Sequence, residues 1–202
     1  MLLTTLEQLE ALYGQPTDRS RWKEIAYLSD DYLAFVAASP FIVLASSGSG
    51  GLDCSPRGDQ PGFVRVLDAR TIAIPDRPGN NRIDTLRNVV EDGRIGVLFM
   101  IPGVGETLRI NGRATLSVDP DLLASFAVDG KPPRSAIVVA IDAVYFHCAK
   151  AFLRSQLWDG SKHVPRAQLP STGDIIKKLA PVPFDAQEYE RDLAERNRTR
   201  LY

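Results

Sequence analysis

The spacing of apolar residues is helical at the start of the chain. After Thr5, leucines recur at helical spacing, and Thr5 with Gln8 resembles a capping box that begins a helix ended by Gly14. The same spacing predicts a second helix over residues 30–38. We expect the two helices to form a prefix, residues 1–39, that lies on the main body. The second helix is expected to turn Leu33, Val36 and Ala37 inward.

From residue 41 the apolar pattern becomes that of β-strands. Short apolar or alternating runs, separated by turns rich in Gly and Pro, predict six to seven antiparallel strands. One inserted helix is predicted near residues 81–90, with Asn80 or Asn81 as its cap. Short turns and a single inserted helix favour a barrel over a doubly wound sheet. The predicted strands cover residues 41–46, 52–57, 62–67, 71–75, 94–101, 107–117 and 135–146.

The predicted fold class is therefore mainly β with peripheral helices. Shorter helices are expected over residues 119–126, 150–158 and 174–180, and the tail beyond Pro183 is charged. The pattern divides the chain into the prefix, a barrel over residues 40–160, and a helical and charged extension over residues 161–202. No internal repeat or convincing linker separates them, so we interpret the whole as one structural domain.

Composition excludes several classes of function. The net charge of −1 provides no general attraction for nucleic acid, and no apolar run approaches the roughly 20 residues of a membrane span. Two cysteines and two histidines argue against a zinc site, so no metal is expected. Unpaired cysteines and a start without a basic n-region fit a cytoplasmic protein.

The clearest chemical signal is the stretch RVLDARTIAIPDRPGNNRIDTLR, residues 65–87. A strand leads through a Pro/Gly/Asn turn into a helix, whose first free amides bind anions. Arg77 and Arg82 can add bidentate contacts to a phosphate. A capped surface helix with solvated arginines is the alternative interpretation.

Three other groups of residues could carry chemistry. Alternation places Arg109 and Arg113 on one face of a strand, which faces solvent by default and otherwise a ligand or a partner. The turn-rich segment 54–65 contains Arg57 and Asp59. On a helix, Lys150, Arg154 and Trp158 would share one face suited to a planar anion, or form an ordinary surface stripe.

The order of these pieces resembles the pyridoxamine 5′-phosphate oxidase-like flavoproteins, or FMN-binding split barrels. The resemblance covers about residues 40–160 and is carried by residues 63–117. The strings SPRGD, IPDRPGNNR and HCAKA are similar to a bacterial subgroup of flavin-nucleotide-binding proteins. The resemblance implies FMN as cofactor and a homodimer with two sites between protomers.

The resemblance also implies a set of cofactor contacts. Two strands would approach the flavin ring, the start of the inserted helix would hold the FMN phosphate, and a second subunit would complete the site. The strand residues are Arg65, Val66, Leu67, Ile74, Pro75 and Asp76. Asn81 and Arg82 match the phosphate positions, beside Arg77 and Asn80, while Glu106, Thr107, Arg109, Lys150, Arg154 and Trp158 fall where the family makes contacts between subunits.

The chain departs from the vitamin B6 oxidases at the substrate end. Those enzymes carry an Arg-Leu-His-Asp-Arg motif, whereas this chain offers RSQLWDG, and Asp68 replaces a family lysine. The resulting hypothesis is an FMN-dependent oxidoreductase acting with an unidentified small-molecule substrate or electron donor, with no catalytic residue assigned. Alternatives are a flavin carrier or sensor, a deazaflavin protein, or a haem protein with His147 as axial ligand.

Overall fold

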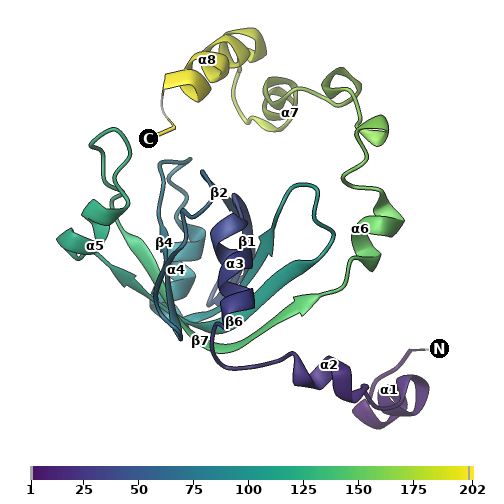
Figure 1. The fold of residues 1–202 in the computed structure, drawn as a ribbon. Coiled ribbons are helices and arrows are strands. Elements are labelled where there is room, and N and C mark those ends of the chain that lie inside the picture. Colours follow the sequence, from purple (N-terminus) through teal and green to yellow (C-terminus); the bar gives the residue numbers. More distant parts are fainter. Residues whose placement is uncertain (1, 200) are drawn as a thin grey trace.

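The computed structural model describes residues 2–199 and 201–202 (Figure 1). A seven-stranded antiparallel sheet has the strand order β2-β1-β5-β6-β7-β4-β3, which puts β2 and β3 at its edges. The strands are β1 (Phe41–Gly48), β2 (Gly51–Gly58), β3 (Arg65–Asp68), β4 (Thr71–Pro75), β5 (Arg94–Met100), β6 (Thr107–Ser117) and β7 (Ala136–His147). The helices are α1 (Leu6–Tyr13), α2 (Asp18–Trp22), α3 (Asp30–Ala38), α4 (Asp84–Glu91), α5 (Pro120–Ser125), α6 (Lys150–Ser155), α7 (Thr172–Leu179) and α8 (Ala186–Thr199), with 3₁₀ turns at Gly160–Lys162 and Arg166–Gln168.

The sheet curls around a main hydrophobic core, with a smaller cluster of Ala73, Phe126 and Ala136 beside it. It forms a split barrel, which confirms the predicted fold class. Alternate residues of β1 and β5 point into that core, as the period of a half-buried strand requires. Helices α3 and α4 add Tyr32, Val36 and Val89 to the core. Burial of such apolar surface is the main favourable term in folding, at roughly 25 cal/mol per Å².

Strand β6 has the predicted bounds, and its pairing with β7 contains a bulge. Asn111 pairs with Ala143 and Gly112 pairs with Ile141, so Asp142 is the extra residue. A side chain on Gly112 would collide with the carbonyl oxygen of Ala140. A glycine at this position therefore allows the two backbones to approach closely.

Several sequence predictions differ from the structure in detail. Helix α4 begins at Asp84 rather than near residue 81, because Asn81 and Ile83 have positive φ angles of 59° and 55°. Val90, near the end of this helix, is 74% exposed. In α3, Tyr32 and Val36 are buried and Leu33 packs against the core as predicted, whereas Ala37 faces solvent.

The N-terminal helix does not lie on the main body, contrary to the prediction. Thr5 caps α1 as expected, but no residue in Leu6–Tyr13 is buried, and Figure 1 shows this purple helix standing away from the barrel. Its leucines have the spacing of an amphipathic helix, but no other described part of the chain covers them. A helix of this length is marginal in water by itself.

The C-terminal extension is more helical than the sequence predicts. It runs from β7 along one side of the barrel through α6 and returns across its top through α7 and α8 (Figure 1). Helix α8 was missed because its apolar residues are few and its charged residues many. None of the described helices is long and apolar enough to cross a membrane.

Candidate functional site

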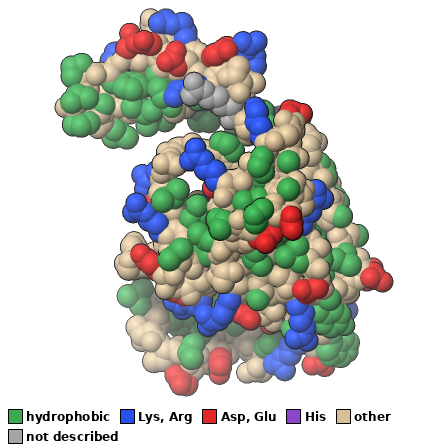
Figure 2. Space-filling model, turned by 90° about the vertical axis from the view of Figure 1, so that its left-hand side faces the viewer, with side chains coloured by type: hydrophobic (Ala, Val, Ile, Leu, Met, Phe, Trp, Pro, Cys, Tyr) green, Lys and Arg blue, Asp and Glu red, His purple; other side chains and the backbone are tan. Residues whose placement is uncertain are grey.

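The larger of two cavities in the described residues has a volume of about 980 Å³ and opens at the end of β4. It lies between β2, the turn that leads into α4, and the loop before β7. Figure 2 shows the molecular surface hollowed between the C-terminal segment at the top and the barrel below, with Lys and Arg side chains beside the hollow. The residues that line the cavity include Asp53, Arg57, Pro75, Asp76, Arg77, Asn80, Asn81, Arg82, Asp84, Thr85, Lys131, Arg134 and Tyr202.

The turn before α4 presents the helix N-terminus to this cavity. The cap position is Ile83, and no described side chain forms a capping hydrogen bond there. The expected caps are therefore wrong: the Asn80 side chain accepts from the amide of Arg82 at 3.1 Å instead. An uncapped first turn leaves amide donors available for an anion.

The backbone of this turn is strained at Ile83. A β-branched residue at φ 55° is an outlier that costs on the order of 1–3 kcal/mol. Strain of this kind is concentrated at ligand sites, where the fold tolerates it because it positions a functional group. Here the strained residue is the one that sets the direction of the first turn of α4.

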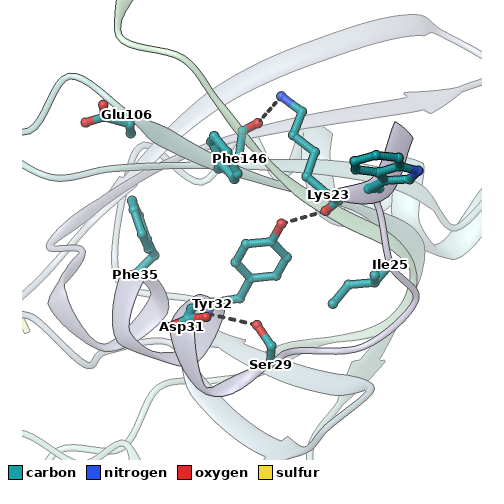
Figure 3. A pocket seen from close by; sticks show the side chains of 9 residues that line it. Lys23, Ile25, Ser29, Asp31, Tyr32, Phe35, Glu106 and Phe146 are labelled. Atoms are coloured by element: carbon teal, nitrogen blue, oxygen red, sulfur yellow. Dashed lines mark hydrogen bonds between the residues drawn. The ribbon is translucent and has the colours of Figure 1, made fainter. Parts of the chain in front are cut away.

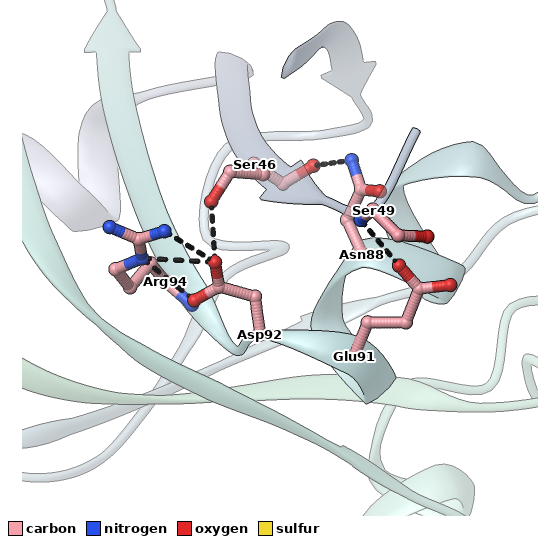
Figure 4. A network of polar contacts seen from close by, with 7 residues as sticks. Ser46, Ser49, Asn88, Glu91, Asp92 and Arg94 are labelled. Carbon is pink, nitrogen blue, oxygen red and sulfur yellow. Dashed lines mark hydrogen bonds and ion pairs between the residues drawn. The ribbon is translucent and has the colours of Figure 1, made fainter. Parts of the chain in front are cut away.

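A polar network fixes the other end of α4 to the barrel (Figure 4). The buried Asn88 donates to Ser46 of β1 at 3.0 Å, and Glu91 accepts from the amide of Ser49 at 2.7 Å. Just after the helix, Asp92 accepts from Ser47 at 3.0 Å and from Arg94 at 2.6 Å. The hydrogen bonds from Arg94, more than any other contact, hold the pKa of Asp92 well below its ordinary value.

A second network ties β2 to the first turn of α4. Thr85, which is 2% exposed, donates to Asp53 at 2.6 Å, and Arg57 reaches Thr85 at 3.4 Å. The hydrogen bond from Thr85 is the main reason that the pKa of Asp53 is lowered, with Ser55 and Arg57 contributing. Asp53 is therefore charged at neutral pH, and Arg57 is held beside the helix N-terminus.

Arg82 stands at the mouth of the same site. Its side chain is 74% exposed, and its Nε forms a 2.7 Å ion pair with Asp84. A pair this exposed contributes little to stability, typically 0–1 kcal/mol. Arg82 is consequently able to turn toward an anion at the start of α4.

Arg77, predicted beside the phosphate positions, lines the cavity but is already bonded to other groups of the protein. Its Nε pairs with Asp59 at 2.7 Å, its Nη1 donates to the carbonyl of Phe126 at 2.9 Å, and its guanidinium lies 5.2 Å from the Tyr202 ring centre. Its side chain is 15% exposed and that of Asp59 is 4% exposed. Arg77 thus builds the wall of the cavity.

The charges on the wall favour an anion. Five basic and three acidic side chains line the cavity, an excess of two positive charges. Burial raises the pKa of Asp76 against the opposing effect of Arg57 and Arg134. The basic residues are Arg57, Arg77, Arg82, Lys131 and Arg134, and the acidic ones are Asp53, Asp76 and Asp84.

The other predicted strand residues lie outside this cavity. Arg65, Val66 and Leu67 are exposed on the edge strand β3, where Arg65 donates to the carbonyl of Ser125 at 3.1 Å. Ile74 is fully buried in the core. In a single chain none of these four residues lines the cavity.

Glu106 lines a smaller cavity of about 370 Å³ between α3 and β7 (Figure 3). Lys23 crosses it and donates to the carbonyl of Phe146 at 2.7 Å, while the Tyr32 hydroxyl donates to the carbonyl of Lys23 at 2.5 Å. Phe35 and Phe146 supply apolar walls. No residue lines both this pocket and the large cavity.

Arg109 lies close to this second pocket. Its guanidinium is 4.6 Å from the Tyr145 ring centre, and its Nε is buried without a hydrogen-bond partner among the described residues. The pKa of His147 is lowered mainly by burial, and the positive charges of Arg109 and Lys23 lower it further. Thr107 is buried. The start of β6 and the end of β7 therefore bring a basic side chain and aromatic rings together.

The predicted face formed by Lys150, Arg154 and Trp158 is wrong. Helix α6 ends at Ser155, because Gln156 has a φ of 51°, so Trp158 lies beyond the helix. Its indole donates to the carbonyl of Val104 at 2.8 Å and stacks on Phe152 with ring centres 5.4 Å apart. None of the three predicted residues lines either described cavity.

Sequence reasoning missed several residues of the large cavity. Arg57 was named with Asp59 in the turn-rich segment 54–65, and it lies in the string SPRGD. It was nevertheless not predicted as a cofactor contact. Thr85, Lys131, Arg134 and Tyr202 reach the site through tertiary contacts that no local pattern reveals. Among the described residues there is no cluster of three His, Cys, Asp or Glu side chains placed to bind a metal.

The fold is that of a split-barrel protein, and the N-terminus of α4 opens on a large cavity. Residues 28–148, more than half of the chain, match the family model described as pyridoxamine 5′-phosphate oxidase. The chain belongs to that family. None of the curated proteins compared with the chain gives a significant match.

Similar solved structures include a variant of HupZ from Group A Streptococcus, with 13% identity, a TM-score of 0.49, and coverage of 59% of this chain and 99% of that one. A general stress protein 26-related member of the pyridoxine phosphate oxidase family, from Clostridium acetobutylicum, has 11% identity, a TM-score of 0.45, and coverage of 58% and 85%. A NimC/NimA family protein from the same organism has 15% identity, a TM-score of 0.40, and coverage of 71% and 95%. The family assignment rests on the family model.

The buried Asp59 predicts a specific pH dependence of stability. Burial is the largest influence on its pKa and raises it, but hydrogen bonds from Tyr202, from the Gln60 amide and from Arg77 outweigh burial and lower the pKa. A depressed carboxyl pKa stabilises the fold above the unfolded pKa of about 3.9, and this stabilisation is lost as pH falls through the folded pKa.

Asp59→Asn should therefore unfold more readily than the wild type near neutral pH, and the difference should shrink below about pH 4, because Asn resembles the protonated carboxyl. Denaturant unfolding measured at several pH values tests this, with the exposed Asp142→Asn as control. A difference that stays constant across the pH range would contradict the assigned role of the Asp59 charge.

Proposed function

We propose that this protein binds FMN and is an FMN-dependent oxidoreductase for a small-molecule substrate. One observation carries the proposal: the uncapped N-terminus of α4 faces a large cavity beside Arg57 and Arg82. A helix end with free amides, flanked by guanidinium groups, is suited to a phosphate ester. Membership of the pyridoxamine 5′-phosphate oxidase family supports the choice of a flavin nucleotide.

The residues present fit a phosphate dianion. Because Asp59 neutralises Arg77, the other four basic and three acidic side chains leave one positive charge in excess on the cavity wall. The free amides at the start of α4 add to this attraction for an anion. Arg57 is already oriented by Thr85, and Arg82 is held only by an exposed ion pair, so binding would cost little reorganisation. Asn81 lies in the same turn with a left-handed backbone conformation.

The remainder of the cavity fits a flat heterocycle. Pro75 is buried at the end of β4 and presents an apolar edge, while Asp76 next to it offers a carboxylate acceptor to ring N–H groups. The cavity volume of about 980 Å³ lies at the upper end of the range for small-molecule sites. A bound flavin supplies hydride and electron chemistry, so the chain's own residues bind, orient and exclude water.

We also propose that the functional unit is a homodimer and that a second copy completes the site. The predicted contacts Glu106, Arg109, Lys150, Arg154 and Trp158 lie away from the large cavity of their own chain. Leu153 in α6 is 73% exposed and Leu157 is 45% exposed, and the leucines of α1 are exposed as well. Large exposed apolar side chains are candidates for an association surface.

Arg82→Ala should weaken FMN binding by about tenfold, the lower end of the range for a hydrogen bond to a charged group. The reason is loss of a direct contact to the phosphate, with the fold intact. Fluorescence titration of the protein with FMN measures the effect. Arg87→Ala is the matched control, because Arg87 is exposed on the same helix and does not line the cavity.

Riboflavin, which lacks the phosphate, isolates the contact. Arg82→Ala should leave riboflavin affinity nearly unchanged. Equal losses for riboflavin and FMN would show that Arg82 acts on the ring or on the fold, and would refute the phosphate assignment. Failure of the wild type to bind either ligand would refute the proposed function itself.

An oxidoreductase and a carrier differ in turnover. If the protein is an enzyme, a reduced nicotinamide or a small amine should bleach the visible absorbance of bound FMN without oxygen, and oxygen or another acceptor should restore it. Bound FMN that no such donor reduces would favour the alternative of a flavin carrier or sensor.

Leu153→Arg should convert a dimer to monomer, because a buried, unpaired charge is costly at an interface. Sedimentation velocity measures the change, and Leu52→Arg, which alters a 91% exposed leucine at the β1–β2 turn, is the control. A wild type that sediments as a monomer at micromolar concentration would contradict the dimer proposal.

A further inference from the structure

The C-terminal segment returns to the barrel at the ligand cavity. After α6 it passes through α7 and α8 across the top of the molecule (Figure 1). In Figure 2 this segment forms the upper lobe above the hollow. Tyr202 lines the cavity, so a distant part of the sequence reaches the site.

Helices α7 and α8 form a unit of their own. The amide of Gly173 donates to the Glu190 carboxylate at 2.6 Å, and a side chain at Gly173 would meet the carbonyl oxygen of Ala186 at 2.7 Å. Phe184 and Tyr189 pack with ring centres 5.4 Å apart. Within Ala186–Thr199 no side chain is buried, so α8 is not anchored to the core.

The attachment of this unit to the barrel is concentrated at Tyr202. The phenol hydroxyl donates to Asp59 Oδ1 at 2.6 Å, and the other carboxylate oxygen of Asp59 pairs with Arg77 at 2.7 Å. The Arg77 guanidinium lies 5.2 Å from the centre of the tyrosine ring. Asp59 is nearly inaccessible, so the bond from Tyr202 reaches a partner fixed in the barrel wall.

We infer that α7 and α8, within residues 172–199, form a strap across the ligand cavity and that Tyr202 is its latch. Breaking the Tyr202–Asp59 bond frees the far end of the strap, while the near end stays attached through α6. The closed strap covers the cavity and slows departure of its ligand. This rests on the proposed function where the ligand is FMN, but the latch itself is independent of the ligand.

The geometry favours a latch over a purely structural contact. The Tyr202 side chain both lines the cavity and donates a hydrogen bond to Asp59. The same side chain therefore closes the strap and completes the cavity wall. A charge-assisted hydrogen bond with a buried partner is strong enough to hold a segment that buries little apolar surface of its own. Regions with few buried apolar contacts open locally at low free-energy cost.

The test compares Tyr202→Ala and Tyr202→Phe with Tyr189→Phe, a matched control that removes a phenol hydroxyl from α8. The first readout is the rate of tryptic cleavage within α8, in full-length protein without added FMN. The second readout is the rate of FMN release after rapid dilution of the loaded protein. Melting temperature is recorded for each variant to show that the barrel remains folded.

Tyr202→Ala should speed both cleavage and release by about tenfold, in line with loss of one charge-assisted hydrogen bond. Tyr202→Phe should have an intermediate effect, and the control should resemble the wild type. Unchanged cleavage in Tyr202→Ala would overturn the latch. Faster cleavage with unchanged FMN release would overturn the role in retention. A wild type that binds no FMN would refute the proposed function, while cleavage would still decide the latch.

Discussion

The arrangement of the site depends on how helix α4 is fixed at both ends. Its C-terminal half is bound to β1 through the buried Asn88 and through Glu91, and Asp92 continues this network just beyond the helix. Its first turn is held to β2 through Thr85 and Asp53. The helix cannot turn away from the cavity without breaking buried hydrogen bonds, and a buried polar group left unpaired is costly. The amide donors of its first turn are thereby preorganised for an anion.

The arginines around the cavity divide into two kinds. Arg77 is saturated by Asp59, Phe126 and the ring of Tyr202, and serves the wall. Arg57 and Arg82 retain unused donors next to the start of α4. This division explains why the three arginines do not make three equivalent anion contacts. It also connects the C-terminal strap to the site, because Asp59 and Arg77 receive its last residue.

The sequence predicts the barrel well and the site in part. Strands such as β6 alternate apolar and polar residues because one face of the sheet is buried and the other is not. The turn before α4 is predicted by its Pro, Gly and Asn residues. The start of α4 was misplaced because the positive φ of Ile83 contradicts the preference of a β-branched residue. Arg134 and Tyr202 could not be assigned, since they reach the cavity only through the fold. Trp158 was misplaced because Gln156 ends α6 early.

The central claim is that the cavity at the start of α4 holds FMN. The most direct test is to denature the purified protein and identify by mass what it releases, with the visible spectrum recorded before denaturation. The account predicts a yellow protein that releases FMN. A colourless protein that releases no flavin and takes up none when FMN is added would contradict it.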